Sequence, residues 1–207
     1  MEKEENSYKV FDTEFESFIG AWFIPTKSCS NLIKLFKKQK KLGHTRKGQH
    51  AEVKNNITKF IIDKKIKDSE DCTFWPNCDL KEIITYRQHL QQCLNRYMNK
   101  YPETSNIDKY NIVENIQIQH YKKGGGYKSW HMERGGPIAS KRVLVFMTYL
   151  NTVEDGGTQF KYQKYICPAK EGLTLIWPTD FTHTHRGQIS LTKEKYIITG
   201  WFSFLND

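Results

Sequence analysis

The sequence has few cysteines, no long apolar run and no low-complexity tract. Its five cysteines are odd in number and scattered, which is typical of free thiols in a reducing cytoplasm and not of a disulfide scaffold. No stretch approaches the roughly twenty apolar residues that a membrane-spanning helix requires. Residues 1–6 are mostly charged and no apolar core follows them, so we expect no signal peptide. These absences predict a cytoplasmic protein with no membrane partner.

The positive charge of the chain is concentrated in one region. Residues 34–67 carry a net charge of +10, whereas the whole chain carries +9, so the remainder is close to neutral. A basic run is usually a solvated helix face and loop, and we favour that interpretation. The alternative is a binding patch for an acidic protein, a phosphate-bearing substrate or nucleic acid.

Two helices are predicted in the first half of the chain. Ser28 is a good N-cap for the first helix, and Gly43 is expected to end it. Asp79 and Glu82 resemble a capping box at the start of the second helix, which Pro102 ends. Apolar residues at helical spacing predict one buried face on each: Leu32, Ile33, Leu35 and Phe36 on the first, and Leu80, Ile83, Ile84, Leu90, Leu94, Tyr97, Met98 and Tyr101 on the second.

The remaining segments favour strands and loops. Residues 11–24 are expected to end in a strand at the edge of the fold, and residues 43–58 to form a loop. Residues 112–121 alternate between apolar and polar side chains, as a strand does, and residues 143–150 and 173–177 resemble buried strands. Strands in the second half and helices in the first predict a mainly β, α+β fold.

Three side chains form a candidate metal site. On a strand, His131 and Glu133 would point to the same face, with Met132 pointing away. A later histidine, His185 or His183, would complete two imidazoles and one carboxylate. This set binds Fe(II) and leaves positions open for cosubstrate and O2. An H-x-E pair alone is weak evidence, because an exposed strand pair has the same pattern.

A lysine begins the last predicted strand, residues 195–204. Lys195, Ile197, Thr199 and Trp201 share one face of it. A lysine buried in an apolar strand needs a partner, and the carboxylate of a cosubstrate would be a suitable one. The alternative is that Lys195 lies at a strand edge in water.

These residues belong to an ordered set of motifs, which is more specific than any single member. In chain order the set is Tyr121, Gly124-Gly125-Gly126, His131 with Glu133, Tyr149-Leu150-Asn151, Gly156-Gly157-Thr158-Gln159-Phe160, Pro168 with Gly172, His185 and Lys195. From about Tyr121 to Phe204 the chain therefore resembles the 2-oxoglutarate/Fe(II) dioxygenases of the prolyl 4-hydroxylase type, especially the short versions carried by marine bacteriophages. If the protein is encoded by a phage, the cytoplasm in question is that of the host.

The resemblance implies a role for each matched residue. His131, Glu133 and His185 would be the iron ligands, although Glu133 stands where most relatives have Asp. His185 is preferred to His183 because it precedes Lys195 by ten residues, as in the family. His183 would lie behind the ligands on the same face. Roles around the cosubstrate are also implied: Lys195 would pair with the C5 carboxylate of 2-oxoglutarate, Tyr149 and Thr199 would donate hydrogen bonds to it, and Tyr121 and Trp201 would line the cavity.

The resemblance also implies a fold. We expect one 2-oxoglutarate/Fe(II) dioxygenase domain over residues 1–207, built as a double-stranded β-helix, or cupin-like jelly roll, with two helices packed on the larger sheet. Residues 1–110 would supply helical support and a basic loop region. Residues 111–207 would form the catalytic jelly-roll core.

The activity implied is hydroxylation of an unactivated C–H bond. The cofactors would be Fe(II), 2-oxoglutarate and O2, with ascorbate as a candidate reductant, and succinate and CO2 would be the coproducts. The expected substrate is a prolyl residue of a protein or peptide. Alternatives are an oxygenase acting on a nucleic-acid base, a free amino acid or a small metabolite, and a non-catalytic jelly-roll binding module. The oligomeric state is left open.

Overall fold

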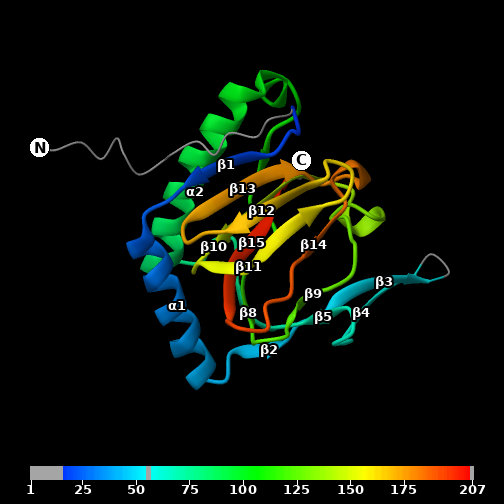
Figure 1. The fold of residues 1–207 in the computed structure, drawn as a ribbon. Coiled ribbons are helices and arrows are strands. Elements are labelled where there is room, and N and C mark those ends of the chain that lie inside the picture. Colours follow the sequence, from blue (N-terminus) through cyan, green and yellow to red (C-terminus); the bar gives the residue numbers. More distant parts are fainter. Residues whose placement is uncertain (1–15, 55–56, 206–207) are drawn as a thin grey trace, which may run out of the picture.

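The computed structural model describes residues 16–54 and 57–205, and in this part of the chain most strands belong to one antiparallel sheet (Figure 1). Its strands are β1 (Gly20–Phe23), β2 (Thr45–Lys47), β6 (Glu70–Phe74), β7 (Tyr110–Asn111), β8 (Ile116–Tyr121), β10 (Arg142–Tyr149), β13 (Leu173–Pro178) and β15 (Lys195–Phe204). They are ordered β1-β13-β10-β15-β8-β6-β2, and β7 also pairs with β15. The central strand is therefore the one that carries Lys195.

Smaller sheets complete the β structure. A three-stranded sheet has the order β12-β11-β14, formed by β12 (Tyr165–Ala169), β11 (Val153–Phe160) and β14 (His185–Gly187). Two further pairs are β3 (His50–Lys54) with β4 (Ile57–Ile61), and β5 (Lys67–Asp68) with β9 (Gly126–Tyr127). In Figure 1 the β3–β4 hairpin projects from the side of the molecule away from the helices.

Both helices, α1 (Thr26–Lys41) and α2 (Lys81–Lys100), cover the same face of the large sheet (Figure 1). Successive side chains of a strand point to opposite faces. On β10, accordingly, Leu144 and Phe146 pack in the core with the helices, whereas Val145 and Met147 pack in a second core with the three-stranded sheet. β10 is therefore buried on both faces. Residues of the second core, including Val145 and Met147, also line the cavity of the candidate site.

The predicted helices are confirmed, but their starts are not. The first helix begins at Thr26, directly after Pro25, and Ser28 lies buried within its first turn. Pro25 occupies the N-cap, and its carbonyl accepts the Ser28 N–H at 2.9 Å. No capping box forms on α2, because its N-cap is Leu80 and no side chain bonds to the first turn. Ile84, expected in the buried stripe, is 37% exposed.

The loop predicted over residues 43–58 is wrong. This region contains β2 and most of the β3–β4 hairpin. The strands were missed because their side chains are mostly polar and show little alternation between apolar and polar residues. Short strands at the edge of a fold bury little apolar surface and need no such pattern. Residues 112–121 form a strand only from Ile116. Of the segment 11–24, residues 11–15 lie outside the described residues, and β1 occupies the sheet edge as predicted.

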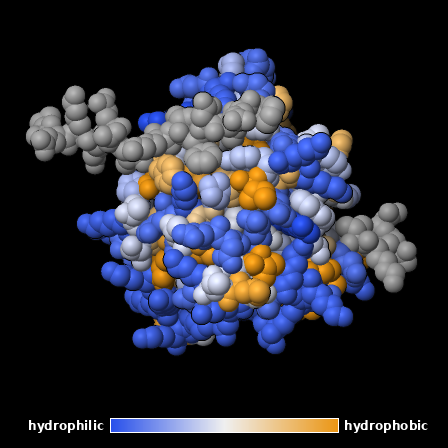
Figure 2. All heavy atoms as spheres, in the orientation of Figure 1, coloured by the Kyte–Doolittle hydropathy of each residue, from blue (hydrophilic) through white to orange (hydrophobic). Residues whose placement is uncertain are grey.

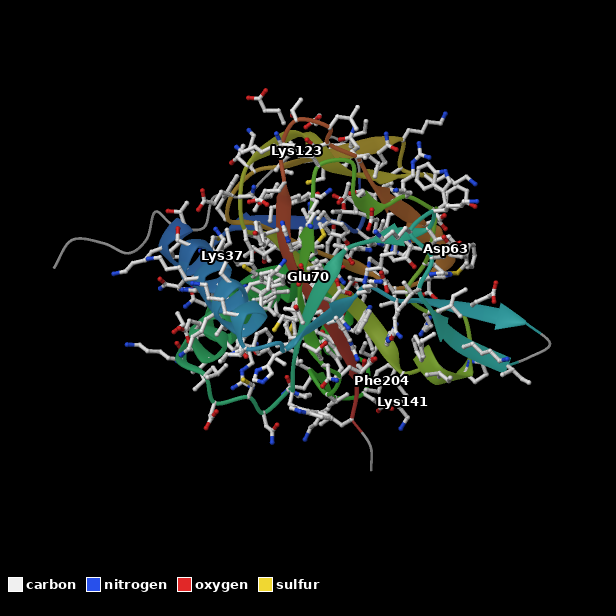
Figure 3. The ribbon with its side chains drawn as sticks, turned by 90° about the horizontal axis from the view of Figure 1, so that it is seen from below. Lys37, Asp63, Glu70, Lys123, Lys141 and Phe204 are labelled. Carbon is white, nitrogen blue, oxygen red and sulfur yellow. The ribbon has the colours of Figure 1, made fainter. Side chains whose placement is uncertain are left out.

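The described part of the basic run at residues 34–67 is spread over several elements, from α1 to β5. Lys37 lies on α1, and Asp63, near the other end of the run, lies on the opposite side of the molecule in Figure 3. Lys40 pairs with Glu70, and the buried Lys67 pairs with Asp71 at 2.7 Å. Hydrophilic residues also dominate the face shown in Figure 2, with separate hydrophobic spots. These findings support a solvated basic region.

None of the described helices has the length and apolar character needed to cross a membrane.

A buried chain of hydroxyl groups joins α2 to the sheet. The Tyr86 hydroxyl lies 3.0 Å from Thr148 Oγ1, which lies 2.7 Å from Thr174 Oγ1. All three side chains are fully buried. Buried hydroxyls need such partners, since an unpaired one has a desolvation cost.

Tyr86→Phe should therefore lower the free energy of unfolding by about 1–2 kcal/mol. The matched control is Tyr162→Phe, which removes a hydroxyl from a ring that is 59% exposed and should change stability by less than about 0.5 kcal/mol. Urea unfolding followed by circular dichroism measures both. Equal effects of the two substitutions would contradict a structural role for the hydroxyl chain.

Candidate active site

Backbone hydrogen bonds bring the two halves of the candidate metal site together. His131 and His185 form an isolated antiparallel bridge, with N–H···O distances of 3.0 and 2.9 Å. The N–H groups of Glu133 and Arg134 both donate to the Thr179 carbonyl at 3.1 Å. The H-x-E segment is therefore a bridged loop and not the strand that was predicted. Met132, expected to point away from the site, is 42% exposed but also lines the cavity that His131 and Glu133 line.

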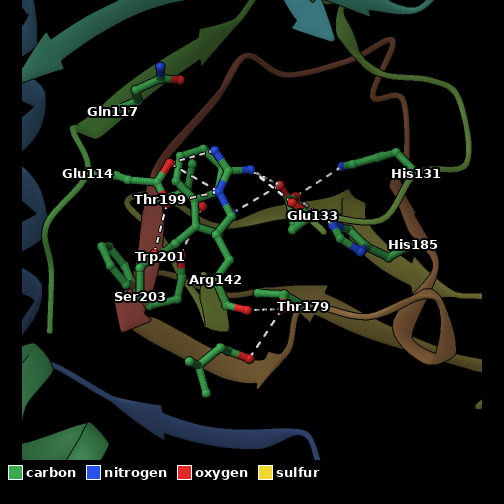
Figure 4. Close-up of polar contacts among 12 residues, drawn as sticks. Glu114, Gln117, His131, Glu133, Arg142, Thr179, His185, Thr199, Trp201 and Ser203 are labelled. Carbon is green, nitrogen blue, oxygen red and sulfur yellow. Dashed lines mark hydrogen bonds and ion pairs between the residues drawn. The ribbon is translucent and has the colours of Figure 1, made fainter. Parts of the chain in front are cut away.

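Three side chains meet at this bridge. Glu133 Oε1 lies 3.4 Å from His131 Nε2 and 3.5 Å from His185 Nε2 (Figure 4). One ligand atom from each residue lies within 4.8 Å of the other two, and among the described residues no other such group of three His, Cys, Asp or Glu is found. Two imidazoles and one carboxylate, converging in this way, match the donor set of a non-haem Fe(II) site.

The two imidazoles are held so that the same ring nitrogen of each faces the site. His131 Nδ1 lies 3.1 Å from the Ser129 carbonyl, and His185 Nδ1 lies 2.9 Å from the His183 carbonyl. A carbonyl can only accept, so each Nδ1 carries a proton, which leaves Nε2 as the ring nitrogen that can bind a metal. This is the arrangement that metal-binding histidines adopt. The residues therefore fit a divalent metal.

The protonation states at the site also suit a metal. Burial lowers the pKa of His131, and the neighbouring His185 lowers it further. Burial alone would raise the pKa of Glu133, but hydrogen bonds and charges from the two imidazoles hold it well below its usual range. A metal binds neutral imidazoles and an ionised carboxylate, so its binding would displace any proton that an imidazole shares with Glu133.

A cavity of about 710 Å³ connects the three side chains to Lys195. The Lys195 side chain is 5% exposed, and its Nζ donates to the carbonyls of Gly156 at 2.7 Å and Gln188 at 3.1 Å. None of the ion pairs found in the described part of the chain includes it. Burial lowers the pKa of Lys195 to about 8, and the charge of Asp155 opposes that change. A buried cation without an acidic partner is suited to binding an anionic ligand.

The Gly-Gly-Thr segment lies in β11, and its Gly156 carbonyl accepts from Lys195. A Cβ on Gly157 would lie 2.3 Å from the Cys167 carbonyl oxygen, so only glycine fits there. The close approach lets Gly157 and Gln188 exchange hydrogen bonds, at 2.7 Å between Gln188 N and Gly157 O. These bonds join the segments that present the Gly156 and Gln188 carbonyls, which are the two acceptors of Lys195.

The other predicted pocket residues all line the same cavity. The Tyr149 hydroxyl lies 2.6 Å from Thr158 Oγ1, and the Tyr121 hydroxyl donates to Gln119. Thr199 Oγ1 donates to the Phe146 carbonyl at 2.8 Å, so its proton is already used. Trp201 Nε1 donates to Glu133 Oε2 at 3.0 Å.

His183 does not share a face with His185. It ends the short 3-10 helix η4 (Phe181–His183), and its Nε2 lies 2.8 Å from the Ser17 carbonyl, away from the metal site. The expectation of two histidines on one strand face is therefore wrong, since the strand starts only at His185. His183 contributes to the site through its backbone carbonyl, which orients the His185 ring.

Several site residues were not recognised in the sequence. The Tyr127 ring stacks on His131, with ring centres 3.6 Å apart and planes at 11°. Arg142 contacts Glu133, and Glu114 pairs with Arg142. Tyr127 belongs to β9, whose pairing with β5 could not be read from the sequence, because Lys67 and Asp68 carry no strand pattern. The Arg142–Glu114 pair could not be predicted either, because isolated Arg and Glu residues are common in any sequence.

Comparison with known proteins agrees with this geometry. Residues 116–203 match the sequence profile of the 2OG-Fe(II) oxygenase superfamily. That segment contains the whole His–Glu–His group and Lys195. No curated protein sequence matches the chain.

Solved structures with a similar fold include prolyl hydroxylases. The viral collagen prolyl hydroxylase of Paramecium Bursaria Chlorella virus-1, solved with 2OG, has a TM-score of 0.64 and 20% identity over 97% of this chain and 98% of that one. A Pseudomonas putida prolyl-4-hydroxylase has a TM-score of 0.66 and 13% identity, over 90% and 92%. A Trichoplax adhaerens prolyl hydroxylase, solved with a hypoxia inducible factor peptide fragment, has a TM-score of 0.62 and 15% identity, over 96% and 84%. The predicted jelly roll with two helices on the larger sheet is confirmed.

His185→Ala should abolish binding of a divalent metal, whereas His183→Ala should leave it nearly unchanged. The first substitution removes a converging Nε2, and the second removes a ring that points toward Ser17. Titration with Co(II), followed by visible absorption, measures the affinity. The loss for His185→Ala should exceed the 10- to 100-fold that removal of an outer hydrogen-bond partner costs. The reverse order of effects would show that His183 is the ligand.

Proposed function

We propose that this chain, whose residues 116–203 match the sequence profile of the 2OG-Fe(II) oxygenase superfamily, is a 2-oxoglutarate-dependent dioxygenase that hydroxylates prolyl residues of a protein or peptide. One observation carries the assignment of the site. A single cavity contains both a converging His–Glu–His group and a buried lysine that lacks an acidic partner in the described part of the chain. The first suits Fe(II), and the second suits the far carboxylate of 2-oxoglutarate.

In this proposal His131, Glu133 and His185 hold the iron through Nε2, Oε1 and Nε2. When bound, Fe(II) with 2-oxoglutarate and O2 supplies oxidation of an unactivated C–H bond, with succinate and CO2 as coproducts. The protein positions the side chains that would bind the metal. The His131–His185 bridge sets the spacing of the ligands, and the carbonyls behind both rings keep each Nε2 directed at the metal.

Lys195 would bind the C5 carboxylate of 2-oxoglutarate. An ammonium group has three N–H donors, and two of them reach Gly156 and Gln188. The third is available for a ligand within the cavity. The paired hydroxyls of Tyr149 and Thr158 are fully or almost fully buried in the same cavity and can reorient toward an anion. Thr199 is a weaker candidate than the sequence suggested, because its proton bonds to Phe146.

The choice of a prolyl substrate rests on the solved neighbours and on the shape of the site. The similar structures include prolyl hydroxylases, one of them solved with a peptide fragment. Exposed apolar residues line the same cavity here, including Phe60 on β4, Trp75 and Ile138. Such side chains are suited to a peptide that places one ring near the metal and lies across the opening.

With Fe(II), 2-oxoglutarate and O2, the protein should add one oxygen atom to a proline-containing peptide and release about one succinate per hydroxylation. A peptide panel analysed by mass spectrometry measures the first, and an enzyme-coupled succinate assay measures the second. Controls are the same peptides with proline replaced by alanine, and free proline and a methylated single-stranded oligonucleotide as other substrate classes. Oxygen addition to the alanine peptides, or oxidation or demethylation of the oligonucleotide alone, would refute the prolyl assignment.

Binding of 2-oxoglutarate should weaken as the pH rises above about 8. The ligand-free Lys195 has a pKa of about 8, while a bound carboxylate stabilises the protonated form and raises the pKa in the complex. Affinity is therefore full below pH ~8 and falls by up to tenfold per unit above it. The charges and rings that face Nζ, Asp155 and Tyr121, are present in both states. Calorimetry on the Mn(II)-loaded protein between pH ~6.5 and ~9.5 measures this dependence.

The matched control is Lys195→Arg, because a guanidinium stays charged throughout this range. The fall in affinity above pH 8 should disappear in this variant. Lys195→Met should bind weakly at every pH while keeping its affinity for Mn(II). An unchanged pH profile in Lys195→Arg would show that another group controls binding.

A further inference from the structure

We infer that Arg142 and Trp201, with Glu114 behind them, are positioning residues that orient the Glu133 carboxylate so that only Oε1 faces the metal site. The inference rests on the proposed ligand set and adds the residues that control its acidic member. It concerns how tightly and in what geometry a metal is bound, and not the identity of the substrate.

The two oxygens of Glu133 have different surroundings. Oε1 faces the two imidazoles, at 3.4 and 3.5 Å. Oε2 accepts the Trp201 indole N–H at 3.0 Å and lies 3.9 Å from Arg142 Nη1. Figure 4 shows the carboxylate between the histidines on one side and the Arg142–Trp201 pair on the other. One oxygen is therefore directed at the metal position while the other is held away from it.

Arg142 holds Glu133 at two places. Its Nη1 donates to the Glu133 backbone carbonyl at 2.9 Å, and the same group approaches the side chain. The guanidinium also lies over the Trp201 ring, 3.5 Å from the ring centre. Stacking of this kind orients a planar cation. Arg142 thus aligns the indole that bonds to Oε2.

Glu114 keeps Arg142 in this position. The pair is bidentate, with Nε–O distances of 3.0 and 3.1 Å and an Nη2–Oε2 distance of 2.6 Å. Ser203 donates to the same carboxylate at 2.8 Å. Without the Glu114 charge, Arg142 would be free to move from 3.9 Å into a close pair with Glu133. A cation in that place would compete with a metal for the carboxylate.

A glutamate ligand needs such support. Its side chain has one more rotatable bond than aspartate, and ordering it has a cost in conformational entropy. A carboxylate can also bind a metal through one oxygen or both. The indole bond to Oε2 disfavours the two-oxygen mode and leaves more positions of the metal open for cosubstrate and O2.

The test measures Co(II) binding to the full chain by visible absorption, without turnover. Trp201→Phe keeps a ring for Arg142 to stack on and removes the N–H. Glu114→Gln keeps the shape and removes the charge. Each should weaken Co(II) binding by about 10- to 100-fold, as loss of a partner behind a ligand does, and each should change the shape of the absorption band, which reports coordination number. Thermal unfolding identifies any variant that does not fold.

The matched control is Asp180→Asn. Asp180 and Arg134 form an equally close bidentate pair, at 2.9, 2.6 and 2.7 Å, next to Glu133 in the chain. Within the described contacts, this pair does not touch the Glu133 carboxylate or Trp201. Asp180→Asn should alter Co(II) affinity by less than about threefold, with an unchanged band.

Each outcome supports or overturns the inference. Wild-type affinity and an unchanged band in both Trp201→Phe and Glu114→Gln would overturn it, as would an equal loss in the control. In those cases the proposed function stands, because the wild type still binds metal. If the wild type binds no Co(II), the ligand set itself is wrong and the proposed function fails as well.

Discussion

The pair of backbone hydrogen bonds between His131 and His185 brings together the two imidazoles around which the candidate metal site is built. These bonds join a loop to the first residue of a strand, so the two imidazoles become neighbours without depending on side-chain contacts. The ring orientation is then set by carbonyls two residues before each histidine. Because small displacements of catalytic groups are expensive, main-chain anchoring is a robust way to place ligands that are distant in sequence.

The burial of Lys195 is the second constraint on the site, and it has a cost in free energy. Transferring an ammonium group from water to the interior is unfavourable unless it is paired. Its two carbonyl acceptors reduce that cost only in part, as the lowered pKa indicates. The remaining imbalance is what favours an anion in the cavity. The glycines of β11 are part of the same arrangement, since a side chain on Gly157 would meet the Cys167 carbonyl of β12 and displace β11, the strand that presents the Gly156 carbonyl.

The sequence predicted the parts of the structure that have strong local patterns. The last strand was predicted with its bounds, and the face shared by Lys195 and Trp201 lines the cavity. The hairpin in residues 43–58 was missed, because short exposed strands lack apolar alternation. The strand assumed for His183 was wrong, since η4 ends there and only tertiary contact with Ser17 determines where the ring points. Arg142 and Glu114 could not be found, because their roles depend on distant partners.

Strand β15 connects the two constraints. It carries Lys195 at one end, and Trp201, further along the same face, contacts Glu133. Pairing with β8 and β10 on either side makes the strand rigid. Lys195 and Trp201 are six residues apart, which corresponds to about 20 Å along the strand. Their side chains and the cavity between them occupy this length. A shift of one residue in pairing would turn both side chains toward the helices. The register of one central strand therefore sets the distance between the Lys195 end and the His–Glu–His end of the pocket.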